Sequence, residues 1–179
     1  MDFCQIQIVA SDIDGTLTDG GMYYTSSGET FKRFSVKDGL GVKLLQAIGI
    51  EVAFISSDDS PIILERGKRL GLRHCYAGVE DKVAVAKAIC EEMDVGLDGM
   101  AYLGDDLQDL ELLQSVGLGA AVGDAHSMVK EVAYYVCKRA GGQNAFREFA
   151  EWLIVQQGRS VQNIWRNRLP KMLVKSKGA

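Results

Sequence analysis

Apolar segments rich in β-branched residues alternate with segments of helical period along the whole chain. Strands are expected at 6–11, 51–55, 74–77, 100–103, 118–122 and 133–136. Helices are expected from Asp38 as N-cap to a stop at Gly49, from Pro61 to a stop at Gly71, and over 82–93, 107–114 and 145–156. This order predicts an α/β fold with one doubly wound, Rossmann-like parallel sheet, whose chemistry lies at the carboxyl ends of the strands.

The segment from Thr18 to Ser35 interrupts the alternation directly after the first strand. Aromatic and threonine-rich runs flank Ser26-Ser27-Gly28, which is typical of a β-hairpin. We expect a hairpin insertion at about 18–36, too short to be a cap domain. One domain over 1–158 and a basic C-terminal tail over 159–179 complete the predicted organisation.

Composition narrows the class of protein. With 179 residues, 47% hydrophobic and 25% charged, the chain has the composition of one globular domain. Its apolar runs are shorter than the roughly 20 residues of a membrane span, so no membrane partner is expected. The N-terminal segment lacks the basic residues of a secretory signal, and a cytoplasmic location is the default expectation. Four scattered cysteines form no CxxC pair and indicate neither a zinc site nor a redox dithiol.

Charge is distributed unevenly along the chain. Because six of the 20 lysines and arginines lie in the last 22 residues, which contain no acid, the remainder has 14 basic and 24 acidic side chains. An acidic body repels nucleic acid, so no nucleic-acid partner is expected. The basic tail is either a binding segment for an anion or a partner subunit, or a solvated and partly mobile terminus.

Asp12-Ile13-Asp14-Gly15-Thr16 stands where the first apolar strand ends. Asp12 can attack phosphorus and form a covalent phosphoryl intermediate, while Asp14 can protonate the leaving oxygen and later deprotonate water. An ordinary polar turn would explain Asp14-Gly15, but not an aspartate at the end of a buried strand.

Three other positions fit phosphate chemistry. Gly104-Asp105-Asp106-Leu107-Gln108-Asp109 also follows an apolar strand, and its carboxylates could join Asp12 around a hard cation such as magnesium. Alone, these acids could simply complement a helix dipole. The Ser56 hydroxyl with a neighbouring backbone N–H could hold a phosphate oxygen, and Lys82 could balance its charge. A loop serine and a surface lysine are the alternatives.

Together these motifs, in this order and spacing, resemble the four motifs of the haloacid dehalogenase superfamily of phosphatases. Further segments are similar to its capless subfamily, which includes the 3-deoxy-D-manno-octulosonate 8-phosphate phosphatases: Leu17-Thr18-Asp19-Gly20, Phe34-Ser35-Val36-Lys37-Asp38-Gly39 and Arg139-Ala140-Gly141-Gly142. The resemblance implies a magnesium-dependent phosphatase that works through an aspartyl-phosphate intermediate.

The resemblance also assigns roles. Asp12 would be nucleophile and metal ligand, Asp14 the acid/base with its main-chain carbonyl on Mg²⁺, and Asp105 the third protein ligand. Asp106 and Asp109 would support the metal ligands without binding the metal themselves. The phosphoryl group would be bound by Ser56, Ser57 and Lys82.

The expected substrate is a phosphorylated 2-keto sugar acid, with 3-deoxy-D-manno-octulosonate 8-phosphate first and a nine-carbon sialic-type acid 9-phosphate as the alternative. Two departures lie where the sugar acid would bind. Where Gly-Arg usually follows the second motif, this chain continues from Ser56 with Ser57-Asp58-Asp59, so that two acids replace a cation, and Asn144 replaces a glycine.

The hairpin carries apolar side chains and an unpaired strand edge, which are better buried against copies of itself. We therefore expect a homo-oligomer, and by resemblance a homotetramer in which each subunit helps to cover its neighbour's site. Two other functions remain open. A phosphorylation receiver has similar residues but takes its aspartate from a middle strand, and a catalytically silent oligomerisation module would not need the complete set of apparent catalytic residues.

Overall fold

A central parallel sheet of six strands organises the molecule. The computed structural model describes residues 2–167 and 169. Its strand order is β5-β4-β1-β6-β7-β8, and every neighbouring pair is parallel. In chain order the strands are β1 (Ile8–Ser11), β4 (Glu51–Ile55), β5 (His74–Tyr76), β6 (Met100–Gly104), β7 (Leu118–Ala121) and β8 (Tyr135–Val136). The predicted doubly wound sheet is confirmed.

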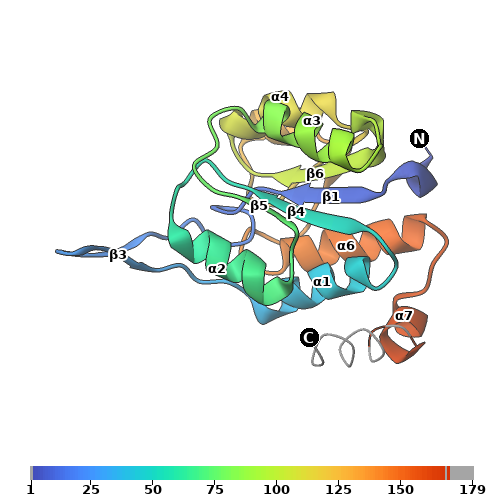
Figure 1. The fold of residues 1–179 in the computed structure, drawn as a ribbon, viewed down its shortest axis with the longest axis horizontal. Coiled ribbons are helices and arrows are strands. Elements are labelled where there is room, and N and C mark those ends of the chain that lie inside the picture. The colour runs from blue at the N-terminus through green and yellow to red at the C-terminus, as the bar shows by residue number, and fades with distance from the viewer. Residues whose placement is uncertain (1, 168, 170–179) are drawn as a thin grey trace.

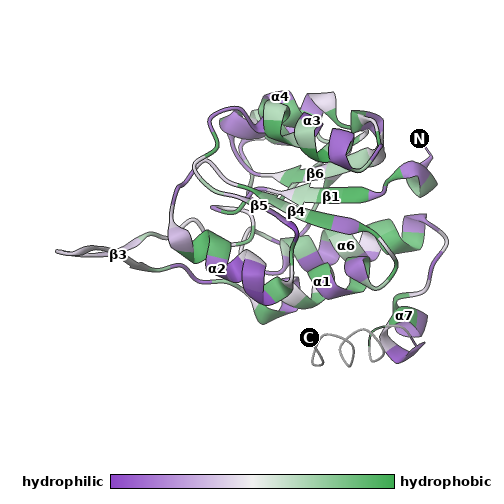
Figure 2. Ribbon diagram, viewed as in Figure 1, coloured by the Kyte–Doolittle hydropathy of each residue, from purple (hydrophilic) through white to green (hydrophobic). Residues whose placement is uncertain are grey.

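Helices cover both faces of this sheet (Figure 1). On one face lie α1 (Val36–Gln46), α2 (Pro61–Leu70) and α6 (Ala145–Gln156). On the other lie α3 (Lys82–Glu92) and α4 (Leu110–Ser115), and α5 (Ser127–Val132) packs against α4 and β7. Figure 2 shows hydrophobic strands between helices of mixed hydropathy, as expected for a sheet that is buried on both faces.

The predicted hairpin is also confirmed. Strands β2 (Tyr23–Thr25) and β3 (Gly28–Phe31) pair antiparallel and project away from the body of the molecule (Figure 1). Between β1 and α1 the described chain contains no other insertion, hence no cap domain. Side chains on the hairpin are largely exposed, including Met22, Tyr24 and Phe31.

The start of α1 differs from the prediction. Ser35 is the N-cap, and its Oγ accepts a hydrogen bond from the Lys37 N–H at 3.1 Å. The prediction of Asp38 as N-cap is wrong, because this carboxylate is buried in the first helical turn and accepts from the Arg147 N–H of α6 at 2.9 Å. An aspartate suits either position, so only the packing against α6 distinguishes them.

Two other helical segments differ from the expectation. The helix expected at 107–114 is a 3₁₀ turn, Leu107–Asp109, followed by α4, and α5 was not predicted. Shorter 3₁₀ turns lie at Phe3–Gln5 and Leu97–Gly99.

Part of the expected tail packs on the domain instead of extending into solvent. Helix α7 (Val161–Asn167) buries Ile164, Leu169 is also buried, and the Arg159 guanidinium donates to the Ile48 carbonyl at 3.0 Å. The domain boundary at 158 stays a prediction, and the basic positions 168, 171, 175 and 177 lie outside the described residues. None of the described helices has the length and apolar character needed to cross a membrane.

Candidate active site

Strand order places the predicted residues at one crevice. The chain runs from β1 outward to β4 and β5, then crosses to β6 on the opposite side of β1. Doubly wound folds bind ligands at such a reversal, beyond the carboxyl ends of the strands. Asp12, Ser56 and Asp105 follow β1, β4 and β6. Because Ser11 pairs with both Phe54 and Leu103, these three strand ends are level.

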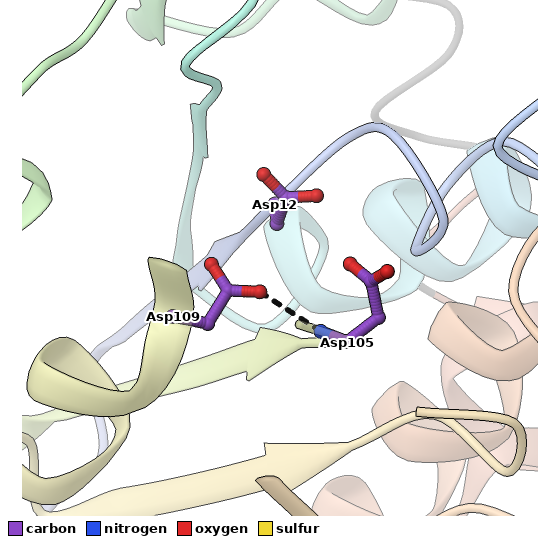
Figure 3. Close-up of side chains that lie close together, drawn as sticks. All are labelled: Asp12, Asp105 and Asp109. Atoms are coloured by element: carbon purple, nitrogen blue, oxygen red, sulfur yellow. Dashed lines mark hydrogen bonds between the residues drawn. The ribbon is translucent and has the colours of Figure 1, made fainter. Parts of the chain in front are cut away.

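An acidic cluster occupies this crevice (Figure 3). Asp12, Asp105 and Asp109 each offer a carboxylate oxygen within 4.8 Å of the others. The Asp109 Oδ2 accepts the backbone N–H groups of Asp105 at 2.9 Å and Asp106 at 3.2 Å. Asp106 itself is exposed and caps the 3₁₀ turn through the Leu107 N–H. Asp109 therefore shapes the loop that carries Asp105.

Lys82, the first residue of α3, lies at the centre of the buried side of the cluster. Its Nζ donates to Asp12 Oδ1 at 2.6 Å, to Asp109 Oδ1 at 2.7 Å and to the Tyr102 hydroxyl at 3.2 Å. Tyr102 in turn donates to Asp109 Oδ1 at 2.7 Å. An ammonium group has three donors, and here all three meet protein oxygens. In this arrangement Lys82 could act on a bound phosphate only through its charge, since its donors are already used.

Tyr102 is a member of the site that sequence reasoning missed. It lies in the middle of β6 and is fully buried. The available signal was a tyrosine inside an apolar strand, because a buried phenolic hydroxyl needs a hydrogen-bond partner.

Burial dominates the electrostatics of the cluster. It raises the pKa of Asp12 well above its usual value, an effect that the nearby Lys82 ammonium only partly offsets. Burial, reinforced by the negative charge of Asp109, raises the pKa of Asp105 to about 6. Burial alone would lower the pKa of Lys82, but Asp12 and Asp109 outweigh it and the net direction is upward. The cluster thus holds more acid than its lysine can balance.

The donor set fits a hard divalent cation. Asp12 Oδ2 is buried and has no hydrogen-bond partner among the residues that the structure describes. An unpaired buried carboxylate oxygen costs free energy, which a metal ligand bond would recover. Both Asp109 oxygens, in contrast, already accept hydrogen bonds. Asp12 and Asp105 are therefore the members of the cluster that could bind a cation directly, whereas Asp109 could support them.

Gly15 allows the acidic cluster to close around the turn after β1. Its backbone has φ +86°, and a Cβ at this position would lie 2.1 Å from Asp105 Oδ2. Asp105 Oδ1 accepts a hydrogen bond from the Thr16 hydroxyl at 3.0 Å. Only glycine fits here, because any side chain would occupy the place of the Asp105 carboxylate.

The segment Arg139-Ala140-Gly141-Gly142 packs against the same turn. The Gly142 N–H donates to the Thr16 carbonyl at 3.0 Å, and a Cβ on Gly141 would lie 1.7 Å from the Gly15 carbonyl oxygen. Asn144 has φ +77°, a left-handed conformation that glycine adopts freely and that asparagine tolerates better than most other residues. The motif thus has a structural role next to the turn that follows Asp12.

A pocket of about 380 Å³ opens above the cluster, a size that suits a small ligand. Its lining includes four predicted site residues and several from the adjoining loops: Asp12, Asp14, Gly20, Met22, Ser56, Ser57, Asp58 and Gln108. Ser56 is buried, and its Oγ accepts the Asp58 N–H at 3.2 Å. A larger hollow of about 570 Å³ beside Lys37 and Arg147 contains none of the predicted site residues.

Lys32 is the second residue that sequence reasoning missed. It follows β3 at the base of the hairpin and is 7% exposed. Its Nζ lies 2.8 Å from Asp14 Oδ1 and 2.6 Å from Asp58 Oδ2. The residues alone placed Asp58 as an added negative charge near the substrate, whereas the structure gives it a cationic partner.

Comparison with known proteins gives a consistent picture. A family model described as haloacid dehalogenase-like hydrolase matches residues 76–144. The 3-deoxy-D-manno-octulosonate 8-phosphate phosphatase of Escherichia coli K12 is 36% identical over 86% of this chain and 82% of its own.

Two solved structures are similar to most of this chain. The cobalt-bound deoxy-D-mannose-octulosonate 8-phosphate phosphatase of Haemophilus influenzae has a TM-score of 0.85 at 37% identity, covering 88% of this chain and 92% of that one. The Moraxella catarrhalis 3-deoxy-D-manno-octulosonate 8-phosphate phosphatase, in complex with magnesium, phosphate and KDO, has a TM-score of 0.84 at 35% identity, covering 88% and 90%.

Proposed function

Because the chain belongs to the haloacid dehalogenase-like phosphatases, in the branch of the octulosonate 8-phosphate enzymes, we propose that it hydrolyses 3-deoxy-D-manno-octulosonate 8-phosphate with Mg²⁺ through an aspartyl phosphate on Asp12. Membership of this family makes it a phosphoric monoester hydrolase. One observation carries the mechanism. Asp12 lies at the pocket next to Asp14 and with Lys82 behind it, and its buried Oδ2 has no hydrogen-bond partner among the described residues.

In the first half-reaction Asp12 attacks the phosphorus atom and the bond to the sugar oxygen breaks. Asp14 gives its proton to that oxygen, so the sugar acid leaves as an alcohol. Lys82 donates to Asp12 Oδ1 in the structure, which helps to orient the Asp12 carboxylate at the pocket. Ser56 and Ser57 line the same pocket, where their polar groups can bind the phosphoryl oxygens.

In the second half-reaction Asp14 takes a proton from water, and the resulting hydroxide attacks phosphorus. The Asp12–phosphorus bond breaks, inorganic phosphate is released and Asp14 holds a proton again. Magnesium, held by Asp12, Asp105 and the main-chain carbonyl of Asp14, would supply the positive charge that lets two acids and a phosphate share one site.

The sugar-acid preference rests on the relatives and on the charge of the pocket wall. Asp58 would repel an anionic sugar if it were unpaired, but Lys32 lies 2.6 Å from it and neutralises it. The charge of Asp58 on the pocket wall is therefore balanced by Lys32, and Asp59, the other acid of this departure, is exposed and does not line the pocket. A nine-carbon sialic-type acid 9-phosphate remains the alternative, because it presents the same kind of carboxylate and terminal phosphate.

A homo-oligomer, in our proposal a homotetramer, completes the site. Met22 lines the pocket, while Tyr24 and Phe31 on the same hairpin are more than half exposed. Tyr23 and Phe31 stack with their centroids 4.2 Å apart and add to this apolar surface. Copies of the hairpin would bury such surface and exclude water from the neighbouring pocket.

A substrate and metal panel tests this function. Purified protein is incubated with the two sugar-acid phosphates, a neutral hexose phosphate and a nucleotide, and released phosphate is measured. We expect octulosonate 8-phosphate to be hydrolysed fastest. Much faster hydrolysis of the hexose phosphate or the nucleotide would refute the substrate class while leaving the mechanism intact.

The same assay distinguishes an enzyme from a silent module. We expect activity with Mg²⁺, none in chelator and inhibition by Ca²⁺, whose longer bonds and looser coordination misplace the nucleophile. No turnover of any phosphate ester with Mg²⁺ would favour the oligomerisation module. Full activity in chelator would contradict a metal-dependent mechanism.

A further inference from the structure

Lys32 occupies a place in the site that the mechanism above does not use. We propose that Lys32 is a positioning residue for proton transfer, whose ammonium group, itself held by Asp58, fixes the Asp14 carboxylate toward the leaving group. The inference rests on the proposed function, since it assigns Lys32 a role through the acid/base residue of that reaction.

Burial of the lysine is the first argument. The Lys32 side chain is 1% exposed, although the hairpin strand that precedes it lies outside the body of the molecule (Figure 1). Burying an ammonium group is costly unless acids pair with it. Asp14 and Asp58 are those acids, and both line the pocket. The lysine is thus directed to the active site and not to solvent.

The second argument is the asymmetry of the Asp14 carboxylate. Oδ1 accepts from Lys32 at 2.8 Å and from the Thr18 hydroxyl at 3.3 Å. Oδ2 is buried and, within the described part of the chain, has no hydrogen-bond partner. Rotation of the carboxylate would exchange the two oxygens. The short, charge-assisted bond to Lys32 is the stronger of the two contacts that prevent this exchange.

Asp58 completes the arrangement. Asp14 must carry a proton in one half-reaction and lack it in the other, so it cannot be a constant counter-charge for the lysine. Asp58 supplies that counter-charge in both, which keeps the Lys32 donor in place. Its backbone is fixed by the bond from its N–H to Ser56 Oγ at 3.2 Å, and its Oδ1 accepts the Ser60 N–H at 3.2 Å.

Leaving groups of different basicity reveal whether Asp14 is still positioned. An alkoxide needs a proton from the general acid in order to leave, whereas 4-nitrophenolate leaves without one. We would therefore measure kcat/KM, which reports phosphoryl transfer to Asp12, for 4-nitrophenyl phosphate, phenyl phosphate and propyl phosphate. None of these carries a sugar or a carboxylate, so any direct contact of Lys32 with the sugar acid does not affect the series.

For Lys32→Met we expect a loss of about 10²-fold on propyl phosphate, an intermediate loss on phenyl phosphate and less than about tenfold on 4-nitrophenyl phosphate. The matched control is Arg33→Met. This neighbour is about half exposed, pairs with Asp19 at 3.4 Å and should change all three rates by the same factor. Equal losses across the series for Lys32→Met, or no loss, would overturn the inference.

A second variant distinguishes the loss of the Lys32 contact from a loss of the fold. Lys32→Met leaves Asp58 as an unpaired partly buried charge, whereas Lys32→Met/Asp58→Asn removes both members of the pair and is less destabilising. The double variant should retain cooperative thermal unfolding and still show the loss that grows with leaving-group basicity. A flat series in a folded double variant refutes the role of Lys32 alone. Absence of wild-type activity on every ester would instead refute the proposed function.

Discussion

Two lysines divide the active site between two regions of the molecule. Lys82 comes from α3, which belongs to the body built on the parallel sheet. Its ammonium group lies between the carboxylates of Asp12 and Asp109. Lys32 comes from the base of the hairpin, and its ammonium group lies between the carboxylates of Asp14 and Asp58. Both side chains are buried and each bridges two aspartates. Lys82, however, belongs to the body with its buried core, whereas Lys32 follows a two-stranded hairpin.

We infer that the two regions have different tasks, phosphoryl transfer for the sheet region and substrate selectivity for the hairpin region. The sheet holds Asp12 and Asp105, the proposed nucleophile and metal ligands, at strand ends whose positions follow from the fold. The hairpin reaches the pocket at its rim, where Lys32 pairs with Asp14 and Asp58. We infer that changes in the sheet region abolish phosphoryl transfer, whereas changes in the hairpin region alter proton transfer and substrate choice.

The largest expected loss of activity is that of Asp12→Asn, which removes the proposed nucleophile. Turnover should be abolished, since the asparagine amide cannot attack phosphorus to form the aspartyl phosphate. Asp14→Asn should also abolish detectable turnover, because loss of general acid/base catalysis alone costs about 10²- to 10⁴-fold. Steady-state phosphate release with Mg²⁺ measures both effects. More than a tenth of wild-type activity in either folded variant is incompatible with these roles.

The next effect is the stability cost of removing the core lysine. Lys82→Met leaves Asp12 and Asp109 buried without their cation, so we expect the free energy of unfolding to fall by about 3–5 kcal/mol. The control is Lys87→Met on the exposed side of the same helix, which should change it by less than about 0.5 kcal/mol. Chemical denaturation measures both. A loss below about 1 kcal/mol for Lys82→Met would mean that the pair contributes little net stability.

The sheet region was the more predictable of the two. Asp12, Ser56 and Asp105 each follow an apolar strand, and parallel strands bring their carboxyl ends together at one edge. Strand endings in the sequence therefore indicate proximity in space. The hairpin was predicted as an element, from its aromatic runs and Ser-Ser-Gly turn, but not its contribution to the site.

The role of Lys32 had no comparable signal. In the sequence it stands in Phe31-Lys32-Arg33-Phe34, where either cation could face solvent. Which one is buried depends on how the hairpin base crosses the body, which is a tertiary contact. Asp58 and Asp38 share this limitation, because their partners, Lys32 and the Arg147 N–H, lie far away in the chain.

The hairpin's outer face should decide the oligomeric state. Tyr24 is 63% exposed, so Tyr24→Asp should leave the fold of one chain intact while opposing association of the hairpins. We expect the homo-oligomer to dissociate to 19.5 kDa and to lose activity at assay concentration. Val155→Asp, on the exposed side of α6, is the control. Size exclusion with light scattering reports the mass, and a fully active 19.5 kDa wild type would contradict site closure by association.

The smallest expected effect concerns a buried aspartate that joins the two regions. Asp38 lies in the first turn of α1, three residues after its N-cap Ser35, where the chain leaves the hairpin and enters the body. Its Oδ1 accepts the Arg147 N–H, whereas its Oδ2 is buried and has no hydrogen-bond partner among the described residues. Burial raises the pKa of Asp38 to about 6, although the Arg147 N–H and the charge of Arg66 partly offset it.

The direction of its pH dependence follows from this raised pKa. An unfolded-state Asp releases its proton near pH 4, so between about pH 4 and pH 6 the folded chain binds a proton that the unfolded chain has lost. The stability contributed by Asp38 is complete below pH 4 and is lost as the pH rises through 6. Asp38→Asn keeps an acceptor for the Arg147 N–H but has no charge to bury. Its free energy of unfolding relative to wild type should therefore rise from pH 4 to pH 7 by at most about 3 kcal/mol. Denaturation midpoints at several pH values measure this difference, and a constant or falling difference would show that the Asp38 carboxylate is already ionised in the folded chain at acid pH.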